Sequence, residues 1–202
     1  AFTHGKDAGF YLEDRNVTGS TGGGNSDCWF KEINLEQEID AAETSCIGAG
    51  NAKTYIPGMQ DATLEMEGFF DRNVVDANSL DYKLDSLHGI NNLVATYLPA
   101  GDSTSLSGIP CYIFRGLLSN HTIETTSDDV ASMELEFQSN VGVQRAEVLH
   151  GLQGRTSGAN GTQVHNGDAS SSTGWSAVLH VTSITGTSTP GVTVTIEDSA
   201  DN

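Results

Sequence analysis

Apolar and polar residues alternate at every second position in several stretches of the chain, as in antiparallel strands that have one buried and one hydrated face. Trp29–Ile39 and Met133–Gln138 show the alternation most clearly. Turns are expected at Pro57–Gly58 and Pro99–Gly101. The pattern predicts a mainly β, antiparallel fold. Its predicted strands are Gly9–Asp14, Trp29–Ile39, Ala62–Phe70, Leu93–Leu98, Cys111–Glu124, Met133–Gln138, Gly142–His150, Ala177–Thr185 and Val192–Glu197.

One stretch has helical spacing instead of strand spacing. Its apolar residues lie three or four positions apart, at Ala77, Leu80, Leu84 and Leu87. Gly89 follows, and a glycine in this place commonly ends a helix. We therefore expect one amphipathic α-helix over residues 74–88, with its apolar stripe packed against the sheet.

The composition divides the chain into three parts. Residues 1–150 contain most of the predicted strands and the helix. Residues 151–174 are mainly Gly, Ser, Thr and Asn, which is typical of a linker or a long surface loop. Residues 175–202 contain about two strands and are expected to form a short C-terminal β-hairpin appendage. Because an isolated hairpin is marginal in water, this appendage should pack on its own domain, a neighbouring subunit or a continuation of the chain.

Acidic residues outnumber basic residues by 27 to 9, and the formal net charge is −18. Tight binding to nucleic acid or to an anionic membrane surface depends on Lys and Arg, so this charge argues against both. We see no apolar stretch of about 20 residues and no signal peptide, and we expect a soluble protein with no membrane partner. The cysteines Cys28, Cys46 and Cys111 are scattered, and we expect them to be reduced.

No catalytic or cofactor-binding motif is apparent. The six histidines lack the spacing of a metal site or a catalytic triad, and Gly48–Gly50 lacks the lysine of a phosphate loop. We therefore expect no enzyme activity, no metal and no cofactor. An acidic carbohydrate-binding or glycoside-cleaving sandwich remains an alternative, because Glu65 with Glu67, or Glu134 with Glu136, would lie roughly 7 Å apart along a strand.

Glutamates recur along the hydrated faces of several predicted strands. Like charges two positions apart on one strand face repel, which costs stability. Such a surface either keeps the protein soluble or repels a polyanion that must pass nearby without adhering. The charge pattern alone leaves both interpretations open.

Ten segments spread over most of the chain resemble, when taken together, the sequences of one family of proteins. They are Ala1–Lys6, Phe10–Asp14, Ile33–Glu38, Asp40–Thr44, Ala52–Gly58, Asp61–Asp71, Ser127–Val130, Met133–Gln138, Gly142–Leu149 and Trp175–Thr182. Taken together they resemble the major tail proteins, or tail tube proteins, of long-tailed, siphovirus-like bacteriophages.

The resemblance implies a barrel-forming β-sandwich with one flanking helix, assembled as hexameric rings that stack into the tail tube. Such a protein is a structural component of the virion tail, made in the host cytoplasm. The tube is a channel for double-stranded DNA during ejection. The implied partners are further copies of the chain and other tail proteins, namely the tape measure, tail terminator and distal tail proteins.

On this interpretation the barrel is built from Trp29–Ile39, Ala62–Phe70, Met133–Gln138 and Gly142–His150. The residues that we expect to line the lumen are Glu32, Glu36, Glu65, Glu67, Glu134 and Glu136. The loops Asp14–Asp27 and Ser45–Tyr55 are expected to make contacts between rings. A capsid decoration protein, or another β-rich protein of the virion surface, is the alternative.

Overall fold

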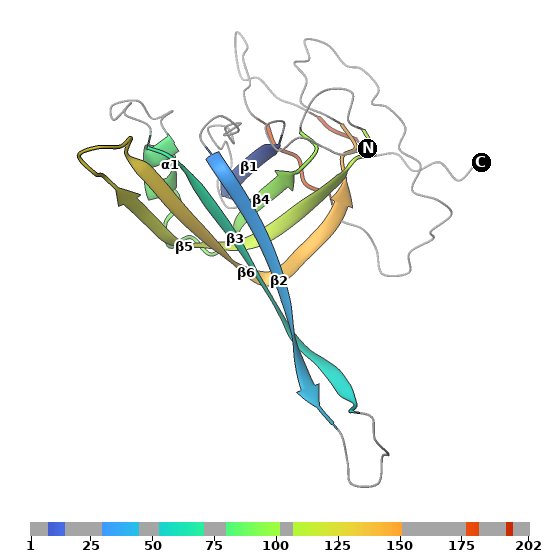
Figure 1. Ribbon diagram of the computed structural model, residues 1–202. Helices are drawn as coiled ribbons and strands as arrows, with labels where there is room; N and C mark the ends of the chain where they lie inside the picture. The colour runs from blue at the N-terminus through green and yellow to red at the C-terminus, as the bar shows by residue number, and fades with distance from the viewer. Residues whose placement is uncertain are drawn as a thin grey trace.

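The computed structural model describes residues 8–14, 30–44, 53–70, 80–101, 107–150, 177–181 and 193–195 of the 202-residue chain. These residues form one six-stranded antiparallel sheet and one short helix, which confirms the mainly β prediction (Figure 1). The strand order in the sheet is β1-β4-β5-β6-β3-β2. The elements are β1 (Gly9–Asp14), β2 (Phe30–Glu43), β3 (Tyr55–Phe69), α1 (Leu80–Leu87), β4 (Leu93–Leu98), β5 (Pro110–Glu124) and β6 (Ser132–Glu147).

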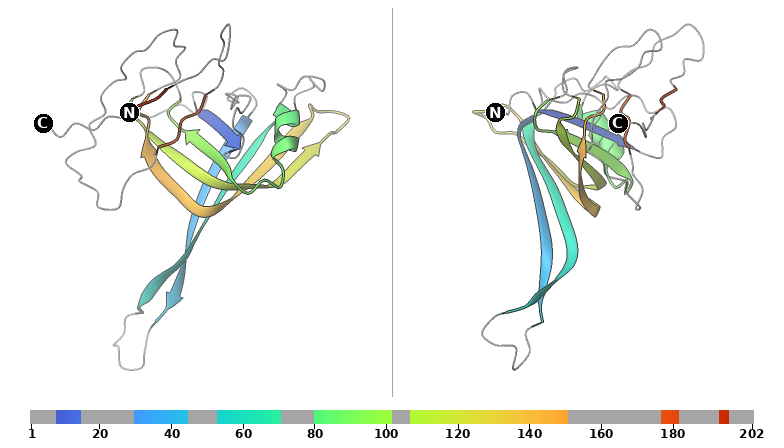
Figure 2. Two further views of the ribbon diagram at one scale, coloured as in Figure 1. Left: turned by 180° about the vertical axis from the view of Figure 1, so that it is seen from behind. Right: turned by 90° about the vertical axis from the view of Figure 1, so that its right-hand side faces the viewer.

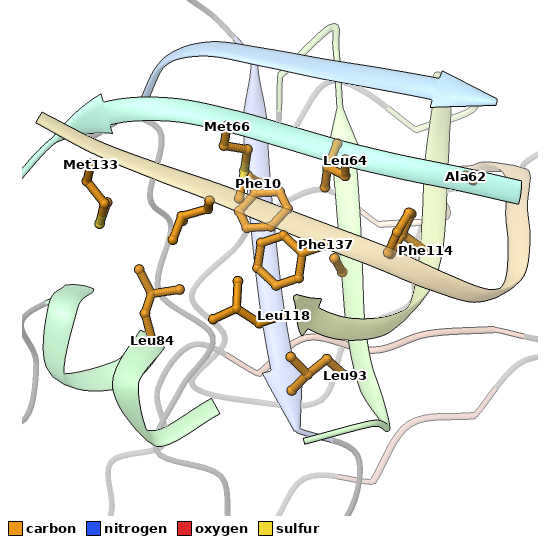
Figure 3. Packing of buried hydrophobic residues seen from close by; sticks show 12 residues of the cluster. Phe10, Ala62, Leu64, Met66, Leu84, Leu93, Phe114, Leu118, Met133 and Phe137 are labelled. Atoms are coloured by element: carbon orange, nitrogen blue, oxygen red, sulfur yellow. The ribbon is translucent and has the colours of Figure 1, made fainter. Parts of the chain in front are cut away.

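The hydrophobic core lies where the sheet curls over itself. Phe10 from β1, Leu64 from β3 and Phe137 from β6 belong to one buried cluster, although three strands lie between β1 and β3 in the sheet (Figure 3). The expected layers of a sandwich are therefore parts of one continuous bent sheet. Along β3 and β6 the buried residues alternate with polar ones, as the sequence predicted. Each fully buried large side chain contributes roughly 1.5–3 kcal/mol.

Helix α1 covers this core at one end. Leu84 is buried in the main cluster and Leu87 packs against it. The helix ends as predicted: the His88 N–H donates to the Leu84 carbonyl at 3.0 Å, and Gly89 has a φ of 80°. A positive φ at this position favours glycine. Residues 74–79 of the predicted helix lie outside the described residues.

Strand β6 joins two segments that the sequence predicted as separate strands, Met133–Gln138 and Gly142–His150. The two halves meet at a bend, visible in Figure 1, where Gly142 has a φ of 75°. The pairing with β5 slips there, from Phe114 opposite Val143 to Gly116 opposite Ser139. A methyl group at Gly116 would overlap the carbonyl oxygen of Gln138, so the close approach of the two strands requires glycine.

Strands β2 and β3 extend beyond the rest of the sheet as a two-stranded arm (Figures 1 and 2). We define the β2–β3 arm as residues 37–43 and 55–61, all of which are exposed. The prediction of a turn at Pro57–Gly58 is wrong, because Pro57 lies opposite Ala41 within the β2–β3 arm. The turn after β4 is confirmed by a bond from the Gly101 N–H to the Leu98 carbonyl at 3.0 Å.

The C-terminal region is described only at residues 177–181 and 193–195. Neither segment has strand structure, so the predicted strands Ala177–Thr185 and Val192–Glu197 are not formed in their described parts. The missing feature is cross-strand pairing, which the alternation of side chains cannot supply by itself. The predicted linker over 151–174 and the remainder of the predicted hairpin lie outside the described residues. No helix in the described part of the chain is long and apolar enough to cross a membrane.

Candidate functional site: an acidic face of the sheet

All six glutamates singled out by the sequence lie on one face of the sheet. On β3, Glu65 and Glu67 alternate with the buried Leu64 and Met66, so they point away from the core. The glutamates of β6 alternate in the same way with buried residues, and those of β2 are exposed. We call this surface the acidic face, defined by Glu32, Glu36, Glu65, Glu67, Glu134 and Glu136.

The strand register arranges the acidic face in cross-strand rungs. In one rung, Glu32 lies opposite Glu67, and Glu67 lies opposite Glu134. In the next rung, Asn34 lies opposite Glu65, and Glu65 lies opposite Glu136. In a third rung, Glu36 faces Thr63. The structure thus brings together carboxylates that are up to about a hundred residues apart in the sequence.

Three of these cross-strand neighbours are pairs of like charge: Glu32–Glu67, Glu67–Glu134 and Glu65–Glu136. Directly opposite side chains in an antiparallel pair are about 4.5–5.5 Å apart at Cβ, and like charges there are destabilising. Four of the six glutamates are exposed and the other two are half-buried, so water solvates the carboxylates. The side-chain amide of Asn34 adds a weak hydrogen bond of 3.5 Å to Glu65. The surface is open, hydrated and strongly negative.

One lysine interrupts the negative charge. Lys31 Nζ lies 2.8 Å from Glu67 Oε1, and the two side chains are 58% and 40% exposed. The hydrogen bond to Glu67 and the charge of that carboxylate raise the pKa of Lys31, with smaller contributions from Glu32 and Asp129. The ion pair partly neutralises the rung in which Glu67 has an acidic neighbour on each side.

Sequence reasoning missed two features of this face. Lys31 occupies a position that strict alternation assigns to the core side, but the pairing is irregular between Phe30 and Glu32. No sequence signal marks that irregularity. The acidic surface also continues into the arm, where Glu38 lies opposite Asp61 and Asp61 accepts a hydrogen bond from Gln138. The alternation of β2 contained the signal for Glu38, because it extends the series of even-numbered polar positions.

In the described part of the molecule, no group of three or more His, Cys, Asp or Glu residues could hold a metal ion. The pairs Glu65 with Glu67 and Glu134 with Glu136 lie on the open face of the sheet. The two members of each pair are two residues apart along one strand, so their side chains point to the same side. The arrangement concentrates negative charge on an open surface of the sheet.

No protein-family model and no curated protein matches the chain. Solved structures do match its fold. A chain of the SPP1 tail tube aligns with a TM-score of 0.55 at 9% identity, over 72% of this chain and 80% of that chain. A chain from the tail of an empty gene transfer agent particle, which has C6 symmetry, aligns with a TM-score of 0.52 at 14% identity, over 72% and 99%.

A third similar structure is the sheath-tube complex of PVC, an extracellular contractile injection system. It aligns with a TM-score of 0.50 at 14% identity, over 72% of this chain and 92% of that chain. The chain therefore has the fold of tail tube proteins, as the resemblance in its sequence implied.

Proposed function

We propose that this chain is the major tail protein of a long-tailed bacteriophage, and that hexameric rings of it stack into a tube whose channel is lined by the acidic face. One observation carries the proposal: six glutamates lie together on one hydrated face of a sheet, and that sheet has the fold of tail tube proteins. A capsid decoration protein has no comparable reason to keep like charges opposite one another.

The electrostatics suit a channel for DNA. Each copy has a formal net charge of −18, so a ring of six copies has a formal net charge of −108. A phosphate backbone near such a wall is repelled within a Debye length, about 8 Å at physiological ionic strength. Binding to DNA requires Lys and Arg to displace counterions, and Lys31 is already paired with Glu67. DNA therefore passes along the wall without adhering to it.

The edges of the sheet suit a ring. In the described part of the chain, β1 and β2 are the two outer strands of the sheet. An exposed strand edge invites pairing with another chain, and a closed barrel removes such edges. We propose that neighbouring copies in the ring pair along these edges, so that the acidic faces form one continuous surface around the channel.

The β2–β3 arm suits contacts between rings. It carries exposed apolar side chains at Ile39, Tyr55, Ile56 and Met59, the last of them 79% exposed. A two-stranded ribbon is marginally stable by itself in water, so the arm needs a packing partner. We propose that the partner is a copy in the adjacent ring. The predicted contact loops Asp14–Asp27 and Ser45–Tyr55 lie mostly outside the described residues, and their role stays a prediction.

The remaining parts of the proposal follow from a tail tube role. The protein is made in the host cytoplasm and becomes part of the virion tail. A tube of this kind has a tape measure protein inside it during assembly, a terminator at one end and a distal tail protein at the other. It is a structural protein, and we propose no catalytic role for it.

Negative-stain electron microscopy of the purified chain at high concentration tests the assembly. Hollow tubes or stacked rings are expected. Monomers or trimers that coat phage heads would contradict the tail tube proposal and support a decoration protein.

Charge reversal tests the lining separately. Glu65→Lys and Glu134→Lys should slow DNA ejection from particles whose tubes still form, because each ring then presents six attractive groups to the phosphates. The matched control is Asp85→Lys, an exposed position on α1, which packs on the opposite side of the sheet. Ejection at the normal rate from intact tubes of both glutamate variants would refute the lining without refuting the tube.

A further inference from the structure

The face of the sheet that carries the glutamates changes character beyond the bend. On β6, the side chains directed away from the main core are Glu134 and Glu136 before the bend, and the exposed Gln144 and the half-buried Ala146 beyond it. The buried Val148 follows directly after the strand on the same side. The apolar half contains a second buried cluster, formed by Tyr11, Leu98, Cys111 and Val148 with Ala146 packed against it. Both faces of the sheet are therefore covered at β1 and β4, although the part of the same face that carries the glutamates is open to water.

Part of the cover comes from residues 177–181 near the C-terminus. The His180 ring stacks on the Tyr11 ring, with centroids 5.3 Å apart and planes 26° apart. His180 Nε2 also forms a 2.8 Å hydrogen bond with Thr96 Oγ1. Tyr11 and Thr96 lie directly opposite each other on β1 and β4, so one histidine contacts both members of a rung.

The burial along this segment alternates from Ala177 to His180. Val178 and His180 are half-buried, whereas Ala177 and Leu179 are exposed, with Leu179 at 55%; Val181 at the end of the segment is half-buried as well. One side of an extended segment thus faces the sheet, without strand hydrogen bonds. Thr96 is the one polar side chain that is buried among the described residues, at 8% exposure. A buried hydroxyl costs free energy unless it has a partner, and His180 supplies that partner.

We infer that the apolar half of this face is a docking surface for the chain's own C-terminal segment, and that His180 is its anchor. Residues 177–181 are then a strap of the β domain and not part of a free appendage. The segment is reached from the end of β6 by the 29 residues 148–176, which is ample chain for a return to β1 and β4. The docked strap keeps apolar surface covered next to the acidic face, where exposed apolar groups would otherwise invite non-specific association.

Cys111 provides a reporter for docking, because it lies in the same buried cluster as Tyr11. Burial, followed by the charge of Glu147, raises the pKa of its thiol, so the reactive thiolate is scarce at neutral pH while the cluster is covered. The experiment uses the full chain with Cys28→Ser and Cys46→Ser, which leaves Cys111 as its one thiol. The rate of labelling by iodoacetamide is measured at neutral pH and in the absence of denaturant.

The test variant is His180→Ala and the matched control is Leu179→Ala, the exposed neighbour in the same strap. Losing one ring stack and one hydrogen bond should raise the labelling rate of Cys111 about tenfold in His180→Ala, and the control should keep the original rate. Equal rates in the two variants would overturn the inference. Thr96→Val, which removes the hydroxyl at nearly constant shape, should give an intermediate rate.

Dilution tests whether the strap that covers the cluster belongs to the same chain or to a second copy. Unassembled chain, isolated by size-exclusion chromatography, is labelled at a series of concentrations. A strap docked within its own chain protects Cys111 equally at every concentration. Protection that falls on dilution would show that a second copy supplies the segment, and it would overturn docking within the chain while leaving the tail tube proposal untouched.

Discussion

Neutralising two glutamates of β6 should make the isolated protein more stable. Glu134 lies opposite Glu67, and Glu136 lies opposite Glu65, so each contributes one like-charge pair to the acidic face. The double variant Glu134→Gln with Glu136→Gln removes both repulsions and keeps the length of each side chain. It leaves the ion pair between Lys31 and Glu67 in place.

The expected gain follows from the number and exposure of the pairs. A like-charge pair directly opposite on a sheet costs up to about 1 kcal/mol relative to a neutral pair. Glu134 is exposed and Glu136 is half-buried, so solvent reduces the repulsion at both positions. We therefore expect a gain of about 1 kcal/mol in the free energy of unfolding for the double variant. For a chain of this length, that gain raises the melting temperature by about 2–4 °C.

The assay is thermal or urea unfolding of the unassembled chain at two ionic strengths. The gain should be largest at about 0.01 M salt, where the Debye length is about 30 Å, and should shrink at about 1 M, where it is about 3 Å. The control is Glu147→Gln on the same strand, because Glu147 lies opposite the uncharged Pro110. It should change the stability by less than about 0.5 kcal/mol.

Two results would refute this reasoning. A double variant that is less stable than the original protein at low salt would mean that the glutamates make favourable contacts within one subunit. A gain that is the same at both salt concentrations would mean that its origin is not electrostatic. Either result would contradict the idea that the chain keeps the destabilising glutamate pairs because they serve the assembled tube.

Two further predictions concern the packing that holds the acidic face in place. Gly116→Ala should cost about 2–3 kcal/mol in urea unfolding, because the new methyl group meets the Gln138 carbonyl, whereas Gly89→Ala should cost about 1–2 kcal/mol from its positive φ alone. Equal costs would mean that β5 and β6 are not close at Gly116. Leu84→Ala should cost about 2–5 kcal/mol, because Leu84 joins α1 to the core. A loss below about 1 kcal/mol would mean that α1 does not pack there.

The sequence determined the strands that carry the core and the acidic face, because side-chain direction alternates with a period of two whatever the neighbouring strand is. The same pattern also predicted strands at Ala177–Thr185 and Val192–Glu197, which are not formed in their described parts. The bounds of β1 and β4 match the predicted Gly9–Asp14 and Leu93–Leu98, and the start of β5 differs by one residue. The same alternation identified all six residues of the acidic face. Gly89 located the end of α1 to within one residue, since a positive φ is a local property of the backbone.

Only the tertiary structure decided which strands are neighbours. The glutamates of β2, β3 and β6 form shared rungs because β6 is inserted between β5 and β3, an order that no local pattern encodes. Lys31 reaches Glu67 because the pairing slips beside it, and the two predicted halves of β6 are one bent strand because β5 pairs with both. His180 rests on Tyr11 and Thr96 through contacts with residues more than 80 positions away. The period of the sequence pattern tells on which face of a strand a side chain lies. Which residue of another strand it meets depends on contacts between segments distant in sequence, and their free energy is gained only when the whole sheet has assembled.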